Sequence, residues 1–127
     1  MIFLSRTVEV KIVKCEICID VDDVARAVRF YGDGIGLSVI KQEPEWAQLK
    51  VDELTIWLMK VSAGKTSLIL RDYSRHWTPV HLDIHVEDIE RTIERALAAG
   101  GKLEARPKPS LANLVDPSGN GVDLVQN

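Results

Sequence analysis

EICIDVDDVARAVRFYGDGIG, residues 16–36, decides the fold, because HLDIHVEDIERTIERALAAGG, residues 81–101, repeats its pattern. The two stretches align without a gap at an offset of 65 residues. The matching positions include Val21 with Val86, Asp23 with Asp88, Val24 with Ile89, Arg26 with Arg91, and Gly36 with Gly101. Two copies of one supersecondary unit predict a pseudo-symmetric domain with a cleft between the copies, where small ligands usually bind.

Each copy begins with a strand and continues into a helix. Residues 12–21 alternate between apolar and polar side chains, which predicts a half-buried strand, and Asp22 and Asp23 suit the start of a helix. We expect the glycines at 32, 34 and 36 to end that helix. In the second copy we expect a strand over 80–86 and a helix that begins near Asp88 and ends at Gly100 and Gly101.

Three further strands complete each copy in this prediction. They are expected at 37–41, 46–51 and 54–61 in the first copy, and at 102–106, 111–115 and 122–126 in the second, with a break at 107–109. The chain is therefore predicted to be one α+β domain, residues 1–127, made of two βαβββ half-units at about 11–61 and 80–127. The connector, residues 62–79, contains a short extended piece at 68–70 and is expected to act as a lid.

Composition narrows the classes of function. The 127 residues are 46% hydrophobic and 28% charged with a net charge of -3, which is ordinary for a globular domain. Because the basic residues form no run, we expect no nucleic-acid partner. No stretch approaches the ~20 apolar residues of a membrane span and no signal peptide is recognised, so we expect a cytoplasmic protein without a membrane partner. Cys15 and Cys18 lie in a strand-like run, which favours two ordinary thiols over a zinc or redox site.

One face of the strands carries unusual side chains. The aliphatic residues are expected under the helices, which leaves a second, open face on the first and fourth strands of each copy. Alternating polar residues are normal on a solvated face, but a Trp and a Met are not. The residues expected on this face are Glu16, Cys18, Asp20, Trp57, Met59, His81, Asp83, His85 and Asp123.

The pattern resembles the vicinal oxygen chelate superfamily, which includes glyoxalase I, bleomycin-resistance proteins and extradiol dioxygenases. The resemblance runs from about Lys11 to Gln126, and the DPSGN turn that enters the last strand is its most specific mark. The other motifs are Val21-Asp-Asp-Val, Phe30-Tyr31 and Gly34-Ile-Gly-Leu in the first copy, and His81-Leu-Asp-Ile-His-Val-Glu-Asp in the second. The resemblance implies that the paired units curl into an open cup, and that the chain forms a homodimer.

The resemblance also implies a metal site. In the metal enzymes of this superfamily, the first and fourth strands of each unit provide one ligand each, which corresponds here to Glu16, Trp57, His81 and Asp123. An indole has no lone pair for a metal, so an incomplete set of Glu16, His81 and Asp123 remains. Such a set suits Mn, Fe, Ni or Zn, although Asp123 is one methylene shorter than the usual Glu.

Two functions stay open at this point. The segment from Trp46 to Met59 resembles bleomycin-resistance proteins, which favours a metal-independent binder of aromatic or cationic small molecules. The alternative is a metal-dependent lyase, isomerase or dioxygenase that acts on vicinal oxygens through Glu16, His81 and Asp123; a subunit with a vestigial cup is a third reading. The residues expected to contact the ligand are Asp20, Trp57, Met59, Trp77, Asp83 and His85. Whether the cleft lies within one chain or across a dimer is left open, and no catalytic residue is assigned.

Overall fold

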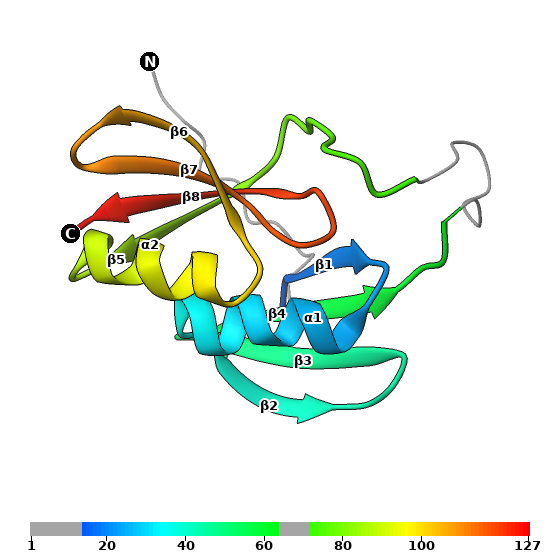
Figure 1. The fold of residues 1–127 in the computed structure, drawn as a ribbon. Coiled ribbons are helices and arrows are strands. Elements are labelled where there is room, and N and C mark those ends of the chain that lie inside the picture. The colour runs from blue at the N-terminus through cyan, green and yellow to red at the C-terminus, as the bar shows by residue number, and fades with distance from the viewer. Residues whose placement is uncertain (1–13, 64–71) are drawn as a thin grey trace, which may run out of the picture.

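The structure, a computed structural model, describes residues 14–63 and 72–127 (Figure 1). The first half contains β1 (Glu16–Val21), α1 (Val24–Val28), its π-helical continuation η1 (Arg29–Ile35), β2 (Ser38–Gln42), β3 (Trp46–Val51) and β4 (Leu54–Lys60). The second half contains β5 (Leu82–Val86), α2 (Ile89–Ala98), β6 (Lys102–Lys108), β7 (Leu111–Val115) and β8 (Gly121–Gln126). The predicted extended piece at 68–70, and the predicted first strand at positions 12 and 13, lie outside the described residues.

Each half forms its own four-stranded mixed sheet. The strand orders are β1-β4-β3-β2 and β5-β8-β7-β6, and in each sheet the first strand pairs in parallel with the last. The remaining neighbours are antiparallel. The two sheets do not close into a barrel, which fits an open cup. The predicted α+β class with two βαβββ units is confirmed.

The two helices begin with the same cap. The carboxylate of Asp23 accepts a hydrogen bond from the backbone N–H of Arg26 at 2.9 Å, and Asp88 accepts from the N–H of Arg91 at 3.0 Å. Such a side chain satisfies one of the backbone donors that a helix start leaves without a partner. Positions that match in the sequence repeat therefore have the same structural role.

The first helix extends further than expected. It continues as η1 through Gly32 and Gly34, and of the three glycines only Gly36, with φ of 105°, ends it. Gly34 has another reason to be small: a Cβ there would lie 3.0 Å from the Cα of Ala96 on α2. The glycine-rich sequence thus permits close packing of two helices.

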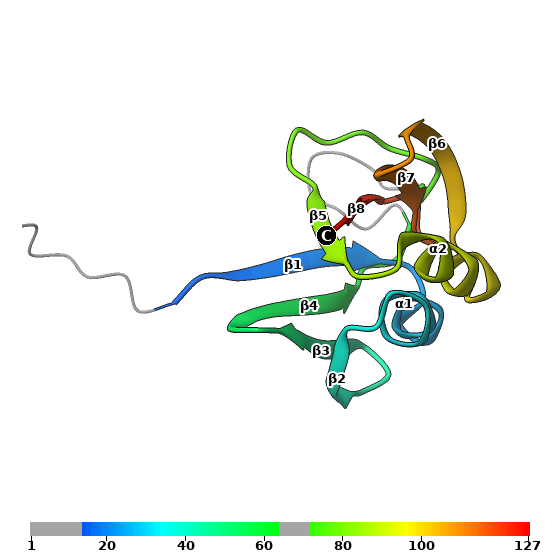
Figure 2. The ribbon, with the colours of Figure 1, turned by 90° about the vertical axis from the view of Figure 1, so that its left-hand side faces the viewer.

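The core lies between these helices and the sheets. Figure 2 shows α1 and α2 side by side, and α2 packs against η1. Phe30 and Tyr31 are fully buried, with their rings edge to face at 4.9 Å. A Cβ at Gly101 would collide with the ring of Phe30, so the second half contacts the first through bare backbone. Among the described residues, neither helix has the length and apolar character that crossing a bilayer demands.

The strand β6 also extends beyond the prediction. The expected break at 107–109 begins later, because β6 includes Pro107 and ends at Lys108. β6 is an edge strand, where a residue without an N–H is tolerated, and its pairing with β7 is irregular near Ala105. Proline at an edge is therefore a weaker break signal than the sequence suggests.

Candidate functional site

The open faces of the two sheets carry different chemistry at equivalent positions. In the β1–β4 pair Cys18 lies opposite Trp57, and in the β5–β8 pair Asp83 lies opposite Asp123. Because Cys18 and Asp83 match in the sequence repeat, Trp57 and Asp123 are structural equivalents. The first sheet presents a thiol and an indole where the second presents two carboxylates.

His81, Asp83 and Asp123 form a compact polar group on the second sheet. His81 lies directly before β5, and its Nε2 is 3.1 Å from Oδ1 of Asp83 and 3.3 Å from Oδ2 of Asp123. Asn113 on β7 donates from Nδ2 to Oδ1 of Asp123 at 2.7 Å, which orients that carboxylate. The side chains of His81 and Asp83 are about half exposed, whereas that of Asp123 is 21% exposed. The group is therefore accessible from solvent and supported by the sheet.

This group has donors that fit a divalent cation. One ligand atom from each of His81, Asp83 and Asp123 lies within 4.8 Å of the others. One imidazole and two carboxylates suit Mn, Fe or Zn and leave coordination positions open. Glu16 is not a member of the group among the described residues, and its carboxylate lies 3.3 Å from Nζ of Lys14. Two of the three predicted ligands thus meet in one chain, Asp83 takes the third place, and ligation by Glu16 stays a prediction.

Two indoles dominate the open face of the first sheet. Trp57 on β4 lies beside Trp46 on β3, with ring centroids 5.6 Å apart and ring planes at 65°. Both are half-buried, and Nζ of Lys41 lies 5.7 Å from the ring centroid of Trp46. Met59, two positions beyond Trp57 on the same strand, is 36% exposed. This face therefore presents an aromatic surface.

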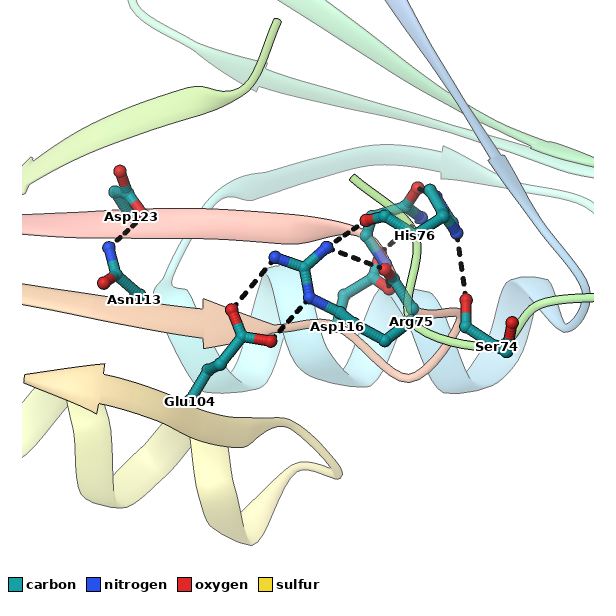
Figure 3. A network of polar contacts seen from close by, with 9 residues as sticks. Ser74, Arg75, His76, Glu104, Asn113, Asp116 and Asp123 are labelled. Carbon is teal, nitrogen blue, oxygen red and sulfur yellow. Dashed lines mark hydrogen bonds and ion pairs between the residues drawn. The ribbon is translucent and has the colours of Figure 1, made fainter. Parts of the chain in front are cut away.

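The connector lies against the second sheet through Arg75. Its Nε and Nη2 donate to the two carboxylate oxygens of Glu104 on β6 at 2.7 and 3.0 Å (Figure 3). The hydrogen bond from Arg75 lowers the pKa of Glu104. The guanidinium also lies 3.6 Å from the ring centroid of Trp77, which is 74% exposed. Trp77 is therefore held beside the sheet by a stack on a residue that is itself fixed.

A hollow of about 370 Å³ lies between the connector and the second sheet. It brings together an aromatic ring, one guanidinium and a set of acidic and polar groups. Its polar and aromatic lining consists of Arg75, Trp77 and Thr78 from the connector, and His81, Glu104, Asn113 and Asp123 from the second half. This hollow is the candidate site of the second half.

Asp20 and His85, also predicted to contact ligand, line other hollows. Asp20 borders a space of about 320 Å³ where the two halves meet, together with His76 and Asn120. His85 borders a space of about 390 Å³ beside Leu37 of the first half. One chain therefore distributes the predicted ligand-binding residues over several surfaces.

Three polar residues of the site were not predicted from sequence. Arg75 and Glu104 are 29 residues apart, and no local pattern indicates that they form an ion pair. Asn113 shows its role only through the register that places it opposite Asp123. Pairing across a sheet depends on the complete fold, so a single sequence carries no signal for these three.

The comparison with protein families decides the relationship of the chain. Residues 16–125 match the family model described as a glyoxalase-like domain. The chain belongs to the glyoxalase-like domain family. A comparison with curated proteins gave no match.

Solved structures show the same fold for this glyoxalase-like protein. A glyoxalase-related enzyme from Fulvimarina pelagi is 20% identical, with a TM-score of 0.65 over 91% of this chain and 89% of the other. The fosfomycin resistance protein FosX from Listeria monocytogenes is 15% identical, with a TM-score of 0.68 over 93% of each chain. The bleomycin-binding protein of Streptomyces verticillus, complexed with copper(II)-bleomycin, is 16% identical, with a TM-score of 0.59 over 93% of this chain and 98% of the other. The family match confirms the predicted resemblance to the vicinal oxygen chelate superfamily, and the solved structures share its fold.

Proposed function

We propose that this glyoxalase-like protein binds an aromatic or cationic small molecule without a metal. The observation that carries the proposal is the pair of Trp46 and Trp57 on an open sheet face, with Trp57 at the position equivalent to Asp123. Indole faces stack on planar rings and attract cations, whereas an indole N–H does not coordinate a metal. The first half therefore offers an indole for stacking on a ligand ring, at the position where the second half has the carboxylate of Asp123.

The second half supplies the complementary charge in this proposal. Asp83 and Asp123 lie close together beside His81, and Glu104 borders the same hollow as Asp123. The charge of Glu104 is already balanced by Arg75, so Asp83 and Asp123 carry the local negative charge. Carboxylates that line a cleft raise the local concentration of cations. A planar cation therefore suits both halves.

We also propose that the complete site forms in a homodimer. Trp57 and Asp123 lie on different sheets, and Trp57 is not part of the hollow that Asp123 lines. Among the described residues β1 pairs with no strand other than β4, and the carbonyl of Asp20 on its other edge accepts from Asn120, so the part of this edge before Asp20 is open to a second copy. In this arrangement the tryptophan face of one protomer lies opposite the acidic group of its partner.

Ligand binding tests the first proposal. We expect a planar acridine cation to quench tryptophan fluorescence, and Trp57→Ala to weaken its binding by about tenfold through the lost stacking. His81→Ala should weaken it less, and Trp57→Phe, which keeps an aromatic face, should retain most of the affinity. A larger loss for His81→Ala than for Trp57→Ala would reject the proposal.

Mixing of variants tests the shared site. Trp57→Ala and Asp123→Ala each remove one side of every site in a homodimer. In a mixed dimer one site carries both changes and the other carries neither. Binding should therefore return in up to half of the sites of the mixed dimers. Light scattering gives the oligomeric state; a monomer, or mixed dimers that bind no better than the parent variants, would contradict a site built from two chains.

The group of His81, Asp83 and Asp123 supports a second candidate function, a metal-dependent lyase, isomerase or dioxygenase. A divalent cation held there would act as a Lewis acid on a substrate with vicinal oxygens. Protein purified without added metal, analysed for its elements and then titrated with Mn, Ni, Zn and Fe, tests this candidate. Stoichiometric metal that is lost on His81→Ala would support it. No metal and no shift in melting temperature on titration would remove it.

A further inference from the structure

His76 contacts the turn before β8 and so attaches the connector to it. Its backbone N–H donates to the carbonyl of Gly119 at 3.2 Å, and its Nε2 lies 2.6 Å from Oδ1 of Asn120. Gly119 has φ of 90°, and a Cβ there would collide with the carbonyl of Ser74. The connector therefore lies directly on the backbone of this turn.

The amide of Asn120 has only one orientation that satisfies its neighbours. Its nitrogen lies 2.8 Å from Oδ2 of Asp116 and 3.2 Å from the backbone carbonyl of Asp20. Both of these oxygens accept, so the nitrogen of Asn120 must face them and donate. The atom that Asn120 presents to His76 is consequently its oxygen.

Both ring nitrogens of His76 then face acceptors. Nε2 is 2.6 Å from the amide oxygen of Asn120, and Nδ1 is 3.1 Å from the backbone carbonyl of Ser74. A neutral imidazole has one N–H, so one of the two contacts would place two lone pairs against each other. A doubly protonated ring donates to both oxygens and satisfies the whole arrangement.

The surroundings of His76 are mostly acidic. Carboxylates come from three separate elements, and the nearest cation already has its own carboxylate partner in Glu104. The charged and titratable groups around it are Asp72 and Arg75 of the connector, Cys18 and Asp20 of β1, Tyr31 of η1, His81 before β5, and Asp116 of the turn. A positive charge on the ring is therefore compatible with its environment.

The neighbours of His76 in the chain form the wall of the candidate site. Arg75 and Trp77 precede and follow it, and both line the hollow beside Asp123. We infer that His76 is a positioning residue, whose doubly protonated ring holds this wall in place and releases it as the ring loses a proton. The use of this wall for a ligand rests on the proposed function, whereas its attachment does not.

Hydrogen exchange of the ligand-free protein tests the inference. The readout is amide protection of the segment 72–80, corrected for the intrinsic effect of pH on exchange, at about pH 5.5 and about pH 8, which bracket the range in which histidine changes charge. Because one hydrogen bond is lost, protection should be about tenfold greater at the lower pH. His76→Gln, which does not titrate, should show no such change. His85→Ala should retain the wild-type change.

Two results would overturn the inference. One is equal protection of the connector at both pH values in the wild type, and the other is an unchanged pH dependence in His76→Gln. If His76→Gln does not fold, the pH dependence of amide protection in the wild type still tests the inference. The amides of β3, a strand without histidine, then serve as the internal reference. Because no ligand is present, failure to bind an acridine cation would count against the proposed function and leave this result intact.

Discussion

Tyr31 and Asp116 join the two halves of the protein through a buried hydrogen bond of 2.7 Å. Tyr31 belongs to η1 and is fully buried, while Asp116, in the turn before β8, is 3% exposed. The other carboxylate oxygen of Asp116 accepts from the backbone N–H groups of Ser118 and Asn120, each at 2.8 Å. Asp116 is the first residue of the DPSGN turn, the most specific family motif in the sequence. This turn therefore anchors the first helix to the second half.

Tyr31→Phe should lower the free energy of unfolding by about 1–3 kcal/mol, because a buried carboxylate oxygen loses a donor. Urea unfolding followed by circular dichroism measures the change. A double-mutant cycle with Asp116→Asn provides the control, since the two changes should be clearly non-additive if the residues interact. A loss below about 0.5 kcal/mol for Tyr31→Phe would contradict the role given to this bond.

The same phenol predicts alkaline sensitivity. The pKa of Tyr31 is raised well above its ordinary value of 10.0, first by burial and then by the charge and hydrogen bond of Asp116. The folded chain thus holds this proton more tightly than the unfolded chain, in which the phenol ionises near pH ~10. The stabilisation is fully present below that pH and is lost as the pH rises above it. Between about pH 9 and pH 11, wild-type unfolding free energy should fall more steeply than that of Tyr31→Phe; parallel curves would disprove this.

Gly34→Ala should destabilise the contact between the helices by about 1–3 kcal/mol, because an inserted methyl group has no space. The new Cβ would lie 3.0 Å from the Cα of Ala96 and 3.2 Å from the Cβ of Ala99. A backbone atom cannot move away as a flexible side chain can. Thermal unfolding measures the effect, and Asp33→Ala at the exposed neighbouring position should stay within about 0.5 kcal/mol of the wild type. Equal melting temperatures for Gly34→Ala and Asp33→Ala would contradict this prediction, because they would show that η1 and α2 can move apart to accept the methyl group at little cost.

Local rules carried the prediction of the fold. Short-range chemistry predicts the alternation of the strands, the helix caps at Asp23 and Asp88, and the DPSGN turn. The sequence repeat then predicts that the chain contains two copies of the unit. The errors lie where tertiary contacts override a local signal. Gly34 continues a helix because α2 lies against it, and Pro107 stays in a strand because β6 is at an edge.

The candidate site was harder to predict for the same reason. The register of the repeat places Asp83 and Asp123 opposite each other, so their proximity follows from the sequence once the pairing is known. The association of Trp57 with Trp46 needs the pairing of β3 with β4 as well. The contacts of Arg75 and His76 depend on where an irregular connector lies, and no periodic pattern determines that position.

The identity of the third ligand, Asp83 or Glu16, separates a metal site within one half from one shared by two chains. Asp83→Asn should weaken binding of Mn or Zn at least about tenfold if the group with His81 and Asp123 holds the cation, because an anionic ligand is lost. Glu16→Gln leaves that group intact and should have no effect in this case, as calorimetric titration would show. A loss of similar size for Glu16→Gln, absent from a monomeric form, would instead place Glu16 of a second copy among the ligands. If Asp83→Asn binds like the wild type while His81→Ala does not bind, the within-chain group is not the metal site.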